Sequence, residues 1–165
     1  MKKILIVGLD GLQMNQINDL QSPNLNKFKN NGFSFENHHS TFPTVTRSNA
    51  ASIVTGVNPG THGIVGNTMV FRDYDSEIIL PVFYSEMLDL YNRTGEILLV
   101  PSLSEILSDN GLSFMVLNSG SSGNAIIQNT AIIKNKQTTL HRDINLDKNE
   151  YSNLPDSIHE RSEEH

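Results

Sequence analysis

An uninterrupted apolar run near the N-terminus, Ile4 to Leu9, limits the possible folds of this chain more than any other segment. The run is rich in β-branched residues and is apolar on both faces, a pattern typical of a strand buried inside a parallel sheet. It ends at Asp10-Gly11. We therefore expect an α/β fold in which Asp10 lies at the C-terminal edge of the first strand, where ligands collect in open α/β sheets.

Cap and stop residues predict helices over residues 22–31, 46–55 and 102–110. The first segment begins with Ser-Pro, the second with Thr, and the third has Ser and Glu at the spacing of a capping box. A glycine follows each segment, as is common at helix C-termini. In the second helix we expect Ile53 and Val54 to be buried.

Further strands and loops are predicted between these helices. Residues 33–42 alternate in part and predict a strand that ends before a proline, and residues 113–117 predict another strand. The segment 58–93 is rich in Gly, Asn, Asp and Tyr and has no long period, so we expect loops with short extended pieces. A glycine-serine turn then leads into an element at about 125–133.

Residues 1–133 are expected to form the N-terminal part of one domain, and residues 134–165 a polar tail or the start of a further segment. No apolar element closes a core at the C-terminal end, which suggests a chain cut from a longer protein. The apolar run at the N-terminus is too short for a signal peptide or a membrane span, so we expect a cytoplasmic protein.

Charge and cysteine content restrict the partners of the chain. A net charge of -6 and a pI near 5.4 argue against binding to nucleic-acid polymers or anionic membranes, which requires clustered Lys and Arg. The chain has no cysteine. Any metal ion would therefore take oxygen or imidazole ligands. The oligomeric state is left open by the sequence.

Thr46 is the main candidate for chemistry because it opens a predicted helix. Backbone N–H groups and the helix dipole favour a phosphoryl oxygen at this position, and a cation-activated hydroxyl can attack phosphorus. Asn49, one turn later, could direct its amide N–H to the same anion. Each residue also has a plainer interpretation, because Thr46 could only cap the helix, Asn49 could be solvated, and Asp10 could be a turn residue.

The segment 42–56, FPTVTRSNAASIVTG, continued by VNPGTHGIVGN, resembles the nucleophile segment of the type I phosphodiesterase and nucleotide pyrophosphatase family of the alkaline phosphatase superfamily. The likeness extends over about residues 1–124. It implies an alkaline-phosphatase-like α/β sandwich with a largely parallel central sheet. It also implies that Thr46 is the nucleophile, that Asp10 and Thr46 are metal ligands of two divalent ions, zinc in this family, and that Asn49 binds the phosphoryl oxygens.

Some residues depart from the family pattern. Arg47 directly follows the expected nucleophile. It could bind the substrate phosphate, and an arginine shortly after the nucleophile also resembles sulfatases, or it could be an exposed helix arginine. The later Asp-His pair that supplies metal ligands in the family does not occur in this sequence. Asp156 and His159 have the wrong spacing for ligands, and His62 is expected in the turn after the helix rather than at a metal.

These observations predict a metal-dependent hydrolase of small-molecule phosphate esters, of the phosphodiesterase or nucleotide pyrophosphatase type, acting through a phosphoryl-threonine. This 165-residue chain alone is expected to be inactive. Two alternatives stay open. The chain could be a truncated, non-catalytic homologue that binds an anion, or the reaction could be that of a phosphatase, sulfatase or phosphonate hydrolase of the same superfamily.

Overall fold

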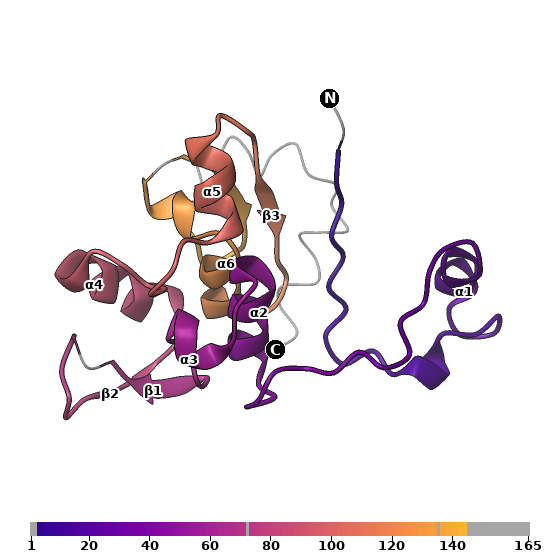
Figure 1. Ribbon diagram of the computed structural model, residues 1–165, viewed down its shortest axis with the longest axis horizontal. Coiled ribbons are helices and arrows are strands. Elements are labelled where there is room, and N and C mark those ends of the chain that lie inside the picture. Colours follow the sequence, from indigo (N-terminus) through magenta and orange to yellow (C-terminus); the bar gives the residue numbers. More distant parts are fainter. Residues whose placement is uncertain (1–2, 72, 135, 145–165) are drawn as a thin grey trace. The chain divides into compact units, whose positions relative to one another are not determined.

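The computed structural model describes residues 3–71, 73–134 and 136–144 (Figure 1). The chain divides into two compact units, Met1–His39 and Ser40–His165, which are described in turn as unit 1 and unit 2. Asp156 and His159 lie outside the described residues.

Unit 1 contains a short 3-10 helix, η1 (Met14–Gln16), and one α-helix, α1 (Pro23–Asn30). The predicted helix at this position is confirmed, and Pro23 occupies its first turn because proline lacks the N–H that would remain unpaired there. Its last turn carries basic residues, which suit the negative end of the helix dipole. None of the residues 3–39 is buried, so unit 1 has no core of its own.

The strands predicted at 4–9 and 33–42 do not form, and both predictions are wrong for this structure. Ile4 and Leu5 are 89% and 86% exposed. A strand inside a parallel sheet needs hydrogen-bonded neighbours on both sides, and the described part of unit 1 contains no strand that could supply them. Asp10 consequently lies in a turn with Gly11, whose φ of 79° is readily adopted by glycine.

Unit 2 holds the remaining elements, which combine helices with very short strands. In chain order they are α2 (Thr46–Thr55), α3 (Pro59–His62), β1 (Thr68–Val70), β2 (Ile79–Pro81), α4 (Tyr84–Thr94), α5 (Leu103–Asp109), β3 (Met115–Leu117), α6 (Ser122–Gln128), η2 (Thr130–Lys134) and β4 (Thr138–Leu140). No helix within the described ranges is long and apolar enough to cross a membrane.

The strands form two separate sheets of two strands each within the described residues. β1 pairs with β2 in antiparallel register, and β3 pairs with β4 in parallel register, with Val116 opposite Thr139. The fold class is therefore mixed α/β, as expected. The largely parallel central sheet is not observed, because the predicted strand at 4–9 is absent and each described strand has a single partner.

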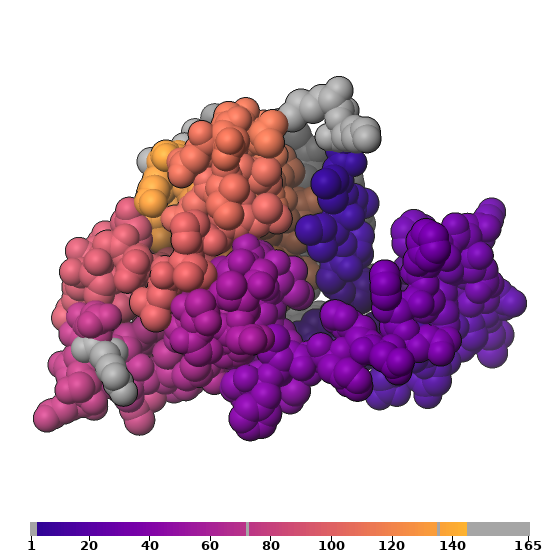
Figure 2. All heavy atoms as spheres, in the orientation of Figure 1, coloured from indigo at the N-terminus to yellow at the C-terminus, as the bar shows by residue number. Residues whose placement is uncertain are grey.

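The core of unit 2 lies between α2, α4 and α6. Ala51 of α2 and the isoleucines Ile126 and Ile127 of α6 are fully buried, and the small side chain of Ala51 lets the two helices approach closely. Val54 is buried as predicted, but Ile53 is 69% exposed because it falls off the helix face that carries Ala51 and Val54. In the space-filling view α2, α4 and α5 form one continuous packed surface (Figure 2).

Local signals explain which helices the sequence predicted. In α5 the Ser102 Oγ accepts a hydrogen bond from the Glu105 N–H at 3.3 Å, and Glu105 Oε2 accepts one from the Ser102 N–H at 3.0 Å, which is the predicted capping box. α4 lies within the segment predicted as loops. Its Met87 and Leu90 are buried one turn apart, an apolar stripe that the surrounding polar residues obscure.

Candidate functional site

Thr46 is the first helical residue of α2, and Val45, with an extended backbone, is the N-cap. The expectation that Thr46 caps the helix is therefore wrong by one position, because its own backbone already has helical geometry. The Thr46 hydroxyl still lies on the first turn, where the helix dipole is positive. Gly56 ends the helix with a φ of 72°, as the sequence predicted.

The amide side chain of Asn49 holds the loop that leads into α2. Its Oδ1 accepts hydrogen bonds from the Thr41 N–H at 3.0 Å and from the Thr41 hydroxyl at 3.2 Å. Its Nδ2 donates to the Val45 carbonyl oxygen at 3.0 Å. Asn49 therefore anchors residues 41–45 to the first turn of the helix that carries Thr46.

Arg47 is buried, with 9% of its surface exposed, so the interpretation as an exposed helix arginine is wrong. Its guanidinium carbon lies 5.0 Å from the centroid of the Phe83 ring, within the range of a cation–π interaction. Its backbone N–H donates to Asn67 Oδ1 at 3.4 Å. Burial lowers the pKa of the Arg47 guanidinium, because desolvation disfavours the charged form.

Asp10 lies in unit 1, whereas Thr46, Arg47 and Asn49 lie together on the first turn of α2 in unit 2. The approach of Asp10 to Thr46 that the sequence suggests therefore stays a prediction. Across the described ranges no group of three or more carboxylate, imidazole or thiolate side chains could hold a metal ion.

His62 is the last residue of α3, so its expected place in a turn after α2 is wrong, and its side chain contacts Ser52 of α2. The side chain is fully buried, and its Nδ1 accepts a hydrogen bond from the Ile64 N–H at 3.1 Å. Nε2 must then carry the hydrogen, which it donates to the Ser52 Oγ, 2.9 Å away on α2. Desolvation by burial lowers the pKa of His62, which favours this neutral ring.

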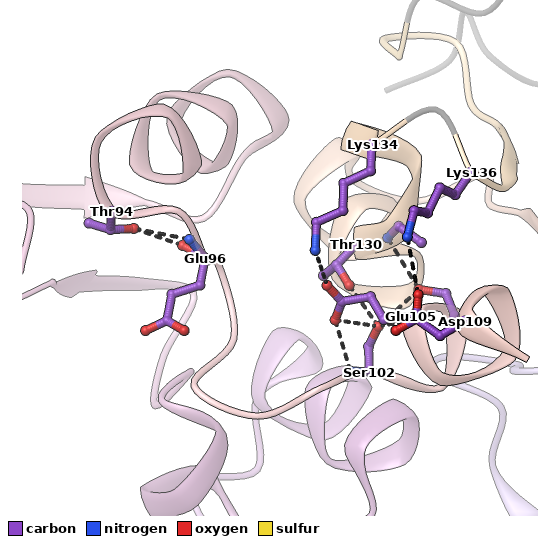
Figure 3. Close-up of polar contacts among 10 residues, drawn as sticks. Thr94, Glu96, Ser102, Glu105, Asp109, Thr130, Lys134 and Lys136 are labelled. Carbon is purple, nitrogen blue, oxygen red and sulfur yellow. Dashed lines mark hydrogen bonds and ion pairs between the residues drawn. The ribbon is translucent and has the colours of Figure 1, made fainter.

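A groove of about 270 Å³ lies elsewhere in unit 2 and contains none of the predicted site residues. Two ion pairs form one wall, Lys134 to Glu105 at 3.2 Å and Lys136 to Asp109 at 3.1 Å (Figure 3). Burial opposes ionisation of Glu105, but hydrogen bonds from the Ser102 N–H and from Lys134 outweigh it and lower the pKa of Glu105. Each of the two lysines in the groove is thus paired with a carboxylate.

Residues 4–83 match the family described as type I phosphodiesterase / nucleotide pyrophosphatase. The matched range contains Asp10 and the whole of α2. The resemblance that the motifs indicated is therefore confirmed for this N-terminal portion of the chain. The further likeness suggested as far as residue 124 stays a prediction.

Curated relatives point to the same family. The chain is 39% identical over 67 residues to the bis(5'-adenosyl)-triphosphatase ENPP4 of Pongo abelii and 37% identical over 67 residues to that of Homo sapiens. Each of these alignments covers 41% of this chain and 15% of the relative. The protein of Xenopus laevis is 34% identical over 71 residues, which cover 43% of this chain and 16% of the relative. No solved structure matches the chain significantly.

The sequence analysis did not identify the residues that contact the first turn of α2 from distant positions in the chain. Phe83 and Asn67 contact Arg47 from 36 and 20 residues further along the chain, and no local pattern indicates these contacts. A weak signal exists in Gly123, which belongs to the predicted glycine-serine turn in the sequence and is the second residue of α6 in the structure. Glycine at a helix start can mark a close approach of backbone to backbone.

Proposed function

We propose that this chain carries the nucleophile segment of a hydrolase that acts on small-molecule phosphate esters of the phosphodiesterase or nucleotide pyrophosphatase type. The observation that carries the proposal is the position of Thr46 as the first residue of α2, inside the segment that matches the family. A hydroxyl at a helix N-terminus lies next to the positive end of the helix dipole, where a phosphoryl group is stabilised.

Thr46 is assigned the role of nucleophile. Its Oγ1 forms a bond to phosphorus, the leaving oxygen takes the electron pair of the broken P–O bond, and the proton of the hydroxyl is lost to solvent. Water then attacks the phosphoryl-threonine, which restores the Thr46 hydroxyl and releases the phosphoryl product. The backbone N–H groups at the start of α2 stabilise the charge on the transferred group.

Asn49 is assigned to the phosphoryl oxygens, and its contacts define what it can do there. One amide hydrogen is donated to Val45, which leaves the second hydrogen of the same Nδ2 as the donor for a substrate oxygen. The hydrogen bonds from Thr41 to Oδ1 fix the orientation of the amide. A preorganised donor of this kind loses little entropy when the substrate binds.

Two divalent ions, zinc by family resemblance, belong to the proposal, with Asp10 and Thr46 as oxygen donors. A bound cation of this kind lowers the pKa of a coordinated hydroxyl. The remaining ligands of the two ions are not assigned. The cytoplasmic location expected from the sequence also stays part of the proposal.

The second candidate is a non-catalytic homologue that binds an anion at the start of α2. One observation favours it, the lack of the family's later Asp-His ligand pair in this sequence. Zinc analysis of the natural protein separates the two candidates, because the hydrolase must retain metal and the binding homologue need not.

The test is turnover of matched nitrophenyl phosphate monoesters and diesters by the protein as its own cell produces it. Thr46→Ala is expected to lower kcat by more than about 10³-fold, because loss of a nucleophile removes the covalent route. Thr46→Ser keeps a hydroxyl and should retain part of the activity.

Thr55→Ala is the matched control. Thr55 lies at the other end of α2, where its hydroxyl donates to the Ala51 carbonyl oxygen. This variant should keep kcat within about twofold of the unmodified protein, because the lost hydrogen bond is local to the helix end. If Thr46→Ala is as active as Thr55→Ala, Thr46 is not the nucleophile. If sulfate esters turn over faster than either phosphate ester, the substrate class is wrong.

A further inference from the structure

Arg47 follows the proposed nucleophile directly, yet its side chain points into the packed part of unit 2. It is 9% exposed and lies against Phe83, the N-cap residue of α4. Its Nε has no hydrogen-bond partner and is shielded from solvent. None of the ion pairs among the described residues involves Arg47. The cation is therefore held by an aromatic face rather than by a carboxylate.

Gly123, near the start of α6, makes room for this arrangement. A Cβ added to Gly123 would lie 2.9 Å from Arg47 Nε and 1.6 Å from the Val82 carbonyl oxygen. Only glycine permits that approach, since a Cβ cannot occupy space already filled by backbone. The start of α6, the segment before α4 and the Arg47 side chain are thus packed together without space for a methyl group.

The same packing fixes the first turn of α2. The Arg47 side chain is held by Phe83 and Gly123, while its backbone N–H donates to Asn67. The side chain and the backbone N–H of Arg47 are thus held by different partners, and together these contacts determine the position and the rotation of the start of α2. Thr46 is bonded to this residue, so the direction of its hydroxyl depends on where Arg47 is held.

We propose that Arg47 is a positioning residue, which orients Thr46 by anchoring the first turn of α2 against Phe83 and Gly123 and does not contact the substrate phosphate. The inference rests on the proposed role of Thr46 as nucleophile. It replaces the substrate-binding role that the sequence suggested for Arg47, because a side chain that is only 9% exposed, with a buried Nε and its guanidinium carbon over the Phe83 ring, is poorly placed to meet an incoming anion.

The experiment combines hydrogen exchange with kinetics for Arg47→Met in the protein as its own cell produces it. The amides of Arg47 and Asn49 should exchange about tenfold faster, because a desolvated cation–π contact of this kind is worth roughly one decade in an equilibrium constant. In the same variant kcat should fall about tenfold while KM stays within about twofold, since an interaction that orients the nucleophile acts on the chemical step.

Arg93→Met is the matched control. Arg93 also lies over an aromatic ring, with its guanidinium carbon 4.2 Å from the Tyr74 centroid, but its side chain is 56% exposed. This variant should leave both the exchange of the α2 amides and kcat unchanged. Arg47→Lys keeps the charge but loses the planar stacking group, so its exchange rates should fall between those of the unmodified protein and Arg47→Met. If Arg47→Met does not fold, the exchange rates of Arg47→Lys test the positioning role of Arg47 instead.

Two results would overturn the inference. A rise in KM with unchanged amide exchange would make Arg47 a substrate contact, and unchanged exchange with unchanged kcat would leave it without a positioning role. Thr46→Ala distinguishes this failure from failure of the proposed function. Thr46→Ala should abolish turnover without faster exchange of the α2 amides. Full activity of Thr46→Ala would refute the role of Thr46 as nucleophile, but it would not change what the exchange rates say about Arg47.

Discussion

Unit 1 and unit 2 use apolar residues in opposite ways. Unit 1 begins with the most apolar run of the chain, yet none of the residues 3–39 is buried. Unit 2 has a more polar sequence in α2 and α6, yet Ala51, Ile126 and Ile127 are completely buried between those helices. Burial in this molecule therefore follows from the partners that surround a segment, and not from the hydrophobicity of the segment itself.

The same difference applies to close packing. In unit 2 the backbone of Gly123 meets the Val82 carbonyl group, whereas a Cβ on Gly8 in unit 1 would meet no atom within 4 Å. Unit 2 is thus packed as densely as a folded interior, in which the addition or loss of one methyl group changes the stability. The stability of the chain should depend almost entirely on unit 2.

Alanine substitution of Gly123 and of Gly8 is expected to give the largest difference between the units in the free energy of unfolding. Gly123→Ala should lower the free energy of unfolding by more than about 4 kcal/mol, because the new methyl group would overlap the Val82 backbone and force α6 away. Gly8→Ala should change it by less than about 0.5 kcal/mol. Urea unfolding followed by circular dichroism measures both values, and equal effects would contradict the contrast between the units.

A matched pair of isoleucines gives the next effect in size. Ile127→Ala should destabilise the protein by about 3 kcal/mol, because it removes a fully buried side chain and leaves a cavity. Ile4→Ala, at a position that is 89% exposed, should have no measurable effect on the same unfolding transition. A large effect of Ile4→Ala would mean that the N-terminal run packs against a partner in solution.

The smallest of these effects is a pH dependence that originates in unit 2. The pKa of the buried His62 is lowered in the folded state, so the unfolded chain binds a proton more readily than the folded one. The stabilising contribution of neutral His62 is therefore complete above about pH 6.5, the unfolded pKa, and is lost as the pH falls below that value.

Unfolding free energies measured between about pH 5 and pH 8 test this pH dependence. His62→Gln should reduce the slope, because glutamine does not titrate. The exposed His38 of unit 1 provides the control, and His38→Gln should keep the slope of the unmodified protein. A slope that is unaffected by His62→Gln would assign the pH dependence to another group.

Local signals explain how far the fold could be predicted. The helices α1, α2 and α5 were found because their start and stop residues act within a few positions, as the capping box of α5 does. The strand expected at Ile4 to Leu9 depends on neighbouring strands, which the sequence of the segment does not contain. β4 was missed because three residues, Thr138–Leu140, give too short a pattern to recognise.

In the candidate site, too, local features could be predicted from the sequence and contacts between distant residues could not. Thr46 and Asn49 could be placed on one helical turn from their spacing alone, whereas His62, expected in a turn, is the last residue of the short helix α3. The burial of Arg47 could not be predicted, since it depends on Phe83 and Gly123, which join it only in the folded chain.

Trapping of the covalent intermediate tests the central claim, the nucleophilic role of Thr46, most directly. The protein as its own cell produces it would be mixed with a phosphate ester, quenched in acid during turnover, and mapped by mass spectrometry of its peptides. The account predicts a phosphoryl group on Thr46 that is absent from Thr46→Ala. Continued turnover with no phosphoryl group on Thr46, or with the group on another residue, would contradict it.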